Sequence, residues 1–68
     1  MKFEIIFDVK QEIDGGFTAE ALGEDIFTQA DTWEELRTNV REAVGAYTFD
    51  QPDTPMIRLR LTRDEVLV

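Results

Sequence analysis

The stretch that decides the fold is Ile26–Leu36, with the sequence IFTQADTWEEL. Its first residues are typical of a short strand, and its last residues open a helix. Thr32 is a good N-cap residue, and Glu35 lies three positions later, where its carboxylate can reach back to the Thr32 backbone N–H. Glu34 and Glu35 also place negative charge at the positive end of the helix dipole. The stretch therefore predicts a joint at which a run of strands passes into a helix.

Three strands are predicted before the helix. Residues 1–13 alternate between apolar and polar side chains, and the sequence Asp14-Gly15-Gly16 supplies a turn. Residues 17–22 alternate again, a second turn follows at 23–25, and the third strand covers 26–29. The positions expected to face the core are Phe3, Ile5, Phe7, Val9, Ile13, Phe17, Ala19 and Ala21. Three consecutive strands joined by short turns predict an antiparallel meander.

One helix is predicted from Trp33 to about Tyr47. Its apolar residues recur at spacings of three and four and form one stripe: Trp33, Leu36, Val40, Ala43, Val44 and Tyr47. The solvent side is assigned to Glu34, Arg37, Thr38, Arg41 and Glu42. Fifteen residues at about 1.5 Å each give a rod of about 22 Å, long enough to lie across a four-stranded sheet. Trp33 has two interpretations, as a core residue or as an anchor of an interface.

The fourth strand is predicted at 56–62, after a loop that holds both prolines. A strand–helix–strand crossover returns parallel to the third strand, and the first strand is the free neighbour with the same direction. The prediction is one α+β domain over residues 1–68, with β-β-β-α-β connectivity, a mixed sheet ordered 3-2-1-4 and one helix on its apolar face. In that order Arg58 and Arg60 face Glu4 and Asp8 across the open side, where ion pairs are expected.

The charge of the chain is unevenly placed. Residues 1–36 hold ten acids against two lysines, which gives −8, and residues 37–68 hold five acids and five arginines, which gives zero. A phosphate backbone would be repelled by the first half, so direct nucleic-acid binding is not expected. A basic protein is the natural complement of that half, and solubility alone is the simpler explanation of its charge. No apolar run approaches a membrane span, so a cytoplasmic protein is expected.

The small size of the chain favours association. A chain of 68 residues without cysteine buries a small core and has no disulfide or thiolate–metal site to reinforce it. A homodimer or higher oligomer is therefore expected. The three apolar residues Val66, Leu67 and Val68 are assigned either to an oligomer contact or to a frayed end.

The order and residues of these elements resemble the HicB-like antitoxin family, a partial RNase H-like fold. The matching segments are 14–20 in the first hairpin, 27–36 at the joint and 41–44 in the helix. The family usually has glycine at the position of Ala30 and alanine at that of Leu36. The resemblance implies a domain that binds and masks HicA, a small basic mRNA-cleaving toxin. Its members usually carry a further DNA-binding module, which the segment after residue 62 is too short to form.

Catalysis is not expected. RNase H chemistry needs several carboxylates that converge on divalent metal ions, and Asp8, in the middle of the first strand, is the position to examine. Its predicted neighbours Arg58 and Arg60 would neutralise it, so a paired surface carboxylate is the preferred interpretation. The chain has no histidine or cysteine and no glycine-rich phosphate loop, so no cofactor is expected either.

Two functional hypotheses remain, besides a residual metal-dependent nuclease. The first is a protein-binding module whose acidic half contacts a basic HicA-like partner through Glu20, Glu24, Asp25, Asp31 and Glu34. The second is a stand-alone domain that assembles with itself and has no toxin partner.

Overall fold

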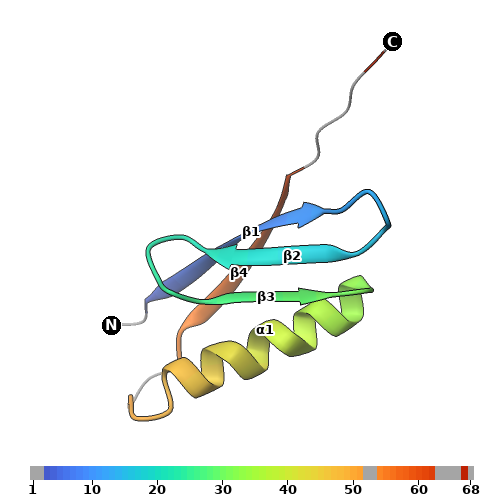
Figure 1. The fold of residues 1–68 in the computed structure, drawn as a ribbon. Helices are drawn as coiled ribbons and strands as arrows, with labels where there is room; N and C mark the ends of the chain where they lie inside the picture. The colour runs from blue at the N-terminus through green and yellow to red at the C-terminus, as the bar shows by residue number, and fades with distance from the viewer. Residues whose placement is uncertain (1–2, 52–53, 63–66, 68) are drawn as a thin grey trace.

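The computed structural model describes residues 3–51, 54–62 and 67, which form a four-stranded sheet with one helix on one face (Figure 1). The elements follow the predicted order β-β-β-α-β. Their bounds are β1 Glu4–Gln11, β2 Phe17–Ala21, β3 Phe27–Ala30, α1 Trp33–Tyr47 and β4 Met56–Thr62. The α+β class and the element order predicted from the sequence are confirmed.

The strands lie in the order β3-β2-β1-β4. β1 pairs antiparallel with β2 and parallel with β4, and β2 pairs antiparallel with β3. Phe7 illustrates the central position of β1, since it lies opposite Ala21 on one side and Leu59 on the other. The predicted order 3-2-1-4 and the parallel docking of the fourth strand beside the first are therefore confirmed.

The first strand is shorter than the alternation suggested. β1 ends at Gln11, and the chain turns at once, with the Gly15 N–H donating to the Glu12 carbonyl oxygen at 3.0 Å. Gly15 has a φ of 96°, which favours glycine. Ile13 was expected to face the core and is fully exposed, because it lies in this turn rather than in the strand. The bounds of β2, β3 and β4 fall within one residue of their predicted positions.

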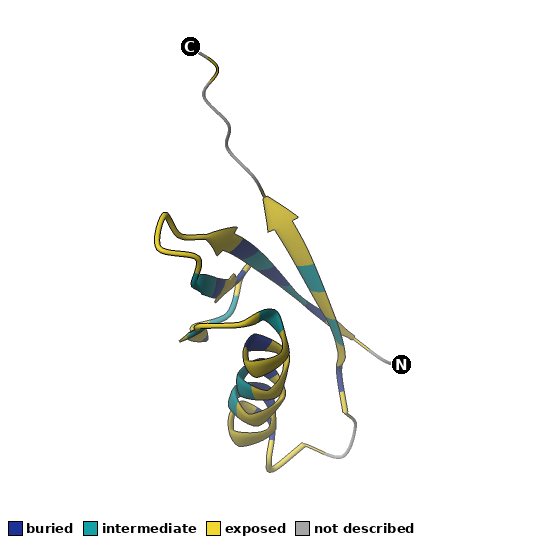
Figure 2. Ribbon diagram, turned by 90° about the vertical axis from the view of Figure 1, so that its right-hand side faces the viewer, coloured by how far each residue is buried: buried dark blue, intermediate teal, exposed yellow. Residues whose placement is uncertain are grey.

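The core lies between the helix and the strands nearest to it. It consists of Ile5, Phe7, Val9, Ala19, Ala21, Ile26, Leu36, Val40 and Val44, all buried. β1, β2 and α1 contribute most of these side chains at the periodicities predicted for them. Figure 2 shows α1 beside the sheet, with buried residues in both.

The helix start forms most of the predicted capping box. The Glu35 N–H donates to the Thr32 hydroxyl oxygen at 3.1 Å, as expected of an N-cap. The Glu35 carboxylate accepts from the Asp31 N–H at 3.4 Å, one residue earlier than the predicted Thr32 N–H. The bond thus links the first turn of α1 directly to the residue that follows β3.

Candidate protein-interaction surfaces

Three of the five predicted contact acids lie near the turn between β2 and β3. Glu20 is exposed on β2, opposite Phe27 of β3, and Glu24 and Asp25 lie in the turn itself. The Tyr47 hydroxyl, at the end of α1, donates to the Glu24 carboxylate at 2.6 Å. This bond and the negative charge of Glu24 raise the pKa of Tyr47 above its ordinary value, because both disfavour the phenolate. The helix end is thereby joined to this acidic turn.

The other two predicted acids lie at the opposite end of β3. Asp31 follows β3 directly, and Glu34 is exposed in the first turn of α1. The five acids therefore form two groups with the length of β3 between them, rather than one cluster. Figure 1 shows the β2–β3 turn and the helix start at opposite ends of the molecule.

Two further acids join the second group. Phe17 lies opposite Ala30, so the turn between β1 and β2 comes to lie beside the end of β3. Glu12 and Asp14 from this turn line one shallow hollow together with Asp31. The sequence analysis missed Glu12 and Asp14 as contact candidates. The register of the β2–β3 hairpin was the signal that would have predicted their position beside Asp31.

The open face of the sheet carries one of the two predicted ion pairs. The Arg58 Nε lies 3.1 Å from the Glu4 carboxylate, which confirms that pair. Asp8 and Arg60 are opposite each other in the β1–β4 register, but the Asp8 carboxylate accepts instead from the Thr62 hydroxyl at 3.1 Å. The two residues share the predicted face, and the structure gives them no ion pair.

No metal centre is visible in the described part of the chain. Within residues 3–51, 54–62 and 67, no three or more acidic side chains come close enough together to hold a metal ion. Asp8 has Thr62 and Arg60 as its neighbours on β4, as expected of a surface carboxylate.

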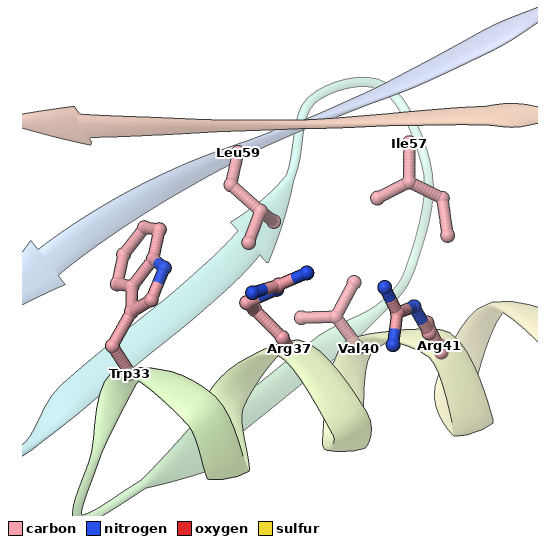
Figure 3. Close-up of a pocket in the computed structure, with 6 residues that line it drawn as sticks. All are labelled: Trp33, Arg37, Val40, Arg41, Ile57 and Leu59. Atoms are coloured by element: carbon pink, nitrogen blue, oxygen red, sulfur yellow. The ribbon is translucent and has the colours of Figure 1, made fainter.

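The side of α1 that faces β4 forms an open groove. Figure 3 shows Trp33, Arg37 and Arg41 extending from α1 toward β4, and Ile57 and Leu59 pointing from β4 toward the helix. The sequence assigned Arg37 and Arg41 to the solvent side, and both are exposed. They also border the groove, which the sequence did not predict, because the helix packs chiefly on β3 and β2. A helix about 10 Å wide covers about two strands at a spacing of about 4.8 Å.

Trp33 lies at one end of this groove. It is half-buried and packs against the core, with its ring edge-to-face to Phe17 at 5.5 Å between centroids and 74° between planes. The structure thus places Trp33 at the margin of the core, where it still lines an open surface.

The predicted oligomer contact falls largely outside the described residues. Val66 and Val68 are not among them, and Leu67 is exposed.

In the part of the chain that the structure describes, no helix is long and apolar enough to cross a membrane.

Comparison with known proteins places the chain in a family. A UPF0150 protein of Archaeoglobus fulgidus is 39% identical over 56 residues, which cover 82% of this chain and 83% of that protein. A UPF0150 protein of Thermotoga maritima is 36% identical over 61 residues, 90% of this chain and 86% of that protein. No family model matches the sequence, and no solved structure matches it. The identity and coverage of these two relatives show that the chain belongs to the UPF0150 family.

Proposed function

We propose that the protein is a non-catalytic binding module of the HicB type, which engages a small basic protein such as a HicA-like mRNA-cleaving toxin. The observation that carries the proposal is the separation of charge across the sheet. The acids of the β2–β3 side are exposed or half-buried at both ends of β3, and no basic residue occurs between Gln11 and Leu36. A partner with two basic patches, separated by about the length of β3, would match this surface.

The proposal includes a cytoplasmic location, because a toxin that cleaves mRNA acts where its substrate is. It assigns no chemical step to this chain, and its carboxylates act as acceptors for the partner's lysines and arginines. The resemblance to HicB-like antitoxins in the segments 14–20, 27–36 and 41–44 supports the choice of partner class.

The test is a binding titration with a purified HicA-like protein encoded beside this chain's gene. Glu20→Lys, Asp25→Lys and Asp31→Lys are made separately and together, and affinity is measured by calorimetry at low and at moderate salt. The triple variant is expected to weaken binding by at least about a hundredfold, because each reversal replaces an attraction by a repulsion. Asp50→Lys, in the exposed loop after α1, is the matched control and is expected to bind as the wild type does.

Two results would count against the proposal. Unchanged binding by the triple variant would exclude the acidic surface, and the absence of binding by the wild type would exclude the toxin-binding function.

The open edge of β4 favours a second candidate function, self-assembly. Among the residues that the structure describes, β4 pairs with β1 alone, and the apolar face of β4 is partly exposed. An unpaired edge of this kind is a site at which another strand can add.

A further inference from the structure

Three adjoining hollows form one continuous groove between α1 and β4. A second hollow shares Trp33 and Leu59 with the central one and continues along β4, and a third shares Arg41 and Ile57 and continues past the end of α1. The groove therefore follows α1 over its whole length. The central hollow, drawn in Figure 3, is lined by Trp33, Arg37, Val40, Arg41, Ile57 and Leu59.

The charge of this groove is opposite to that of the protein. The chain has 15 acids and a net charge of −8, yet none of the described residues that line the three hollows is acidic. The charged residues among them are Arg37 and Arg41. Within the described part of the chain neither arginine has an ion-pair partner, since the ion pair found there joins Arg58 and Glu4. The groove is therefore suited to a negatively charged occupant.

The two arginines stand above an apolar floor. Arg37 and Arg41 are four residues apart on α1, which is about 6 Å along the helix axis, and Figure 3 shows both extending toward β4. Ile57 and Leu59 are half-buried beneath them, and Leu61 is 46% exposed. A matching occupant is apolar where it lies on β4 and carries two negative charges about one helical turn apart on the side that faces α1.

The dimensions of the sheet favour a helix as the occupant. Four strands at a spacing of about 4.8 Å offer room for two helices about 10 Å wide, and α1 packs chiefly on β3 and β2. A strand added at the β4 edge would lie beside β4 and leave Ile57 and Leu59 uncovered, whereas a helix beside α1 would lie on top of them.

The helix α1 of a second copy is not suited to fill this groove. Its apolar side chains Leu36, Val40 and Val44 are already buried in the core of its own domain. α1 is also the only helix within residues 3–51, 54–62 and 67. The occupant is therefore expected to come from another protein.

We propose that the groove between α1 and β4 binds an acidic amphipathic helix of a partner protein. The apolar stripe of that helix covers Ile57, Leu59 and Leu61, and two of its carboxylates, one turn apart, accept hydrogen bonds from Arg37 and Arg41. The inference does not rest on the proposed function, which uses the acidic side chains of this chain and a basic partner.

A pair of synthetic peptides tests the groove. Both are helix-forming, about 15 residues long to match α1, free of tryptophan and equal in their leucine stripe. One carries glutamates at positions i and i+4 on one flank, and the other carries lysines there. The acidic peptide is expected to bind at least about tenfold more tightly than the lysine peptide, although the net charge of −8 favours the reverse.

The fluorescence of Trp33 measures this binding at the groove itself. Trp33 is the single tryptophan, is half-buried and lines the groove, so an apolar stripe that covers it is expected to shift its emission to shorter wavelength. Titration of each peptide while this shift is followed gives both affinities.

Charge reversal tests the part played by the arginines. Arg37→Glu combined with Arg41→Glu is expected to reverse the preference, so that the lysine peptide binds more tightly. The neutral pair Arg37→Gln and Arg41→Gln is expected to remove the preference without reversing it. Arg60→Glu, on the opposite face of the sheet, is the matched control and is expected to bind both peptides as the wild type does. Circular dichroism checks that each variant is folded.

Three results would overturn the inference. The first is the absence of binding by the acidic peptide, or a wild-type preference for the lysine peptide. The second is binding that Arg60→Glu weakens and the reversal at Arg37 and Arg41 does not, which would indicate a strand at the β4 edge. The third is a dimer in sedimentation equilibrium with concentration-dependent Trp33 emission, since a second copy would then cover the groove. The toxin titration affects none of these results, because it concerns other side chains.

Discussion

The two edges of this sheet differ in their contacts with the helix and in the exposure of their side chains. At the β3 edge the helix is close, Asn39 satisfies a carbonyl of the strand, and the helix end is bonded to the β2–β3 turn through Tyr47 and Glu24. At the β4 edge no side-chain hydrogen bond from α1 is present among the described residues, and the apolar side chains are partly exposed. The first edge is acidic and the second carries arginines.

This difference has a simple origin in the dimensions of the elements. Four strands at about 4.8 Å are wider than one helix, so a single helix can cover only part of the apolar face. Here it covers the β3 side and leaves β4 partly open. The β3 side of the sheet thus presents acidic side chains, and the β4 side presents apolar area that the helix does not cover.

The largest expected contrast is between leucines on the two sides. Leu36→Ala, at a fully buried position, is expected to cost about 2–5 kcal/mol, which approaches the whole stability of so small a domain. Leu61→Ala, beside the open groove, is expected to cost less than about 1 kcal/mol in the monomer. Urea denaturation followed by the fluorescence of Trp33, the single tryptophan, compares the two. Equal losses would contradict the difference in packing.

Loss of the helix N-cap is expected to have the next largest effect on the free energy of unfolding. Thr32→Ala removes the acceptor for the Glu35 N–H and is expected to lower the free energy of unfolding by about 1 kcal/mol. Thr38→Ala is the control, because the exposed Thr38 hydroxyl bonds only to the Glu34 carbonyl oxygen and alanine favours the helix. The same urea denaturation measures both. A loss at Thr38 as large as that at Thr32 would argue against the cap.

The ion pair beside β4 is expected to contribute less. A double-mutant cycle with Glu4→Gln and Arg58→Gln should give a coupling of about 0.2–1 kcal/mol, because water reaches both side chains, which are 32% and 60% exposed. The coupling should disappear at about 1 M salt. The matching cycle with Asp8→Asn and Arg60→Gln tests whether the lack of an ion pair there holds in solution. A coupling for Asp8 and Arg60 larger than that for Glu4 and Arg58 would show that the ion pair forms at Asp8 in solution.

The smallest effect concerns the Tyr47–Glu24 bond on the acidic side. The folded-state pKa of Tyr47 lies above its unfolded value of 10.0. The contribution of the bond to the free energy of unfolding is therefore fully present below pH 10. This contribution is lost as the pH rises through the raised pKa. Glu24→Gln should lower the pKa of Tyr47, and the tyrosinate absorbance reports on this residue alone, since the chain has one tyrosine. An unchanged titration would show that the bond is absent in solution.

The site was harder to predict than the fold. Glu20, Glu24, Asp25, Asp31 and Glu34 are close in the sequence, which suggested a single cluster. The β2–β3 hairpin and the helix separate these acids into two groups. The register of that hairpin also brings Glu12 and Asp14 next to Asp31. Arg37 was placed on the solvent side because the apolar stripe alone was used to orient the helix. That it also borders the groove depends on where the helix lies across the sheet.

Local patterns in the sequence determined the elements themselves. Alternation along β1, β2 and β4, the stripe from Trp33 to Val44, and the cap at Thr32 reflect short-range geometry, and the rules of chain connection then fixed the order β3-β2-β1-β4. Only the tertiary structure decided that α1 packs toward β3, that β4 is left as the open edge, and that the acids separate. Those outcomes depend on how one helix shares an apolar face wider than itself, which no local pattern encodes.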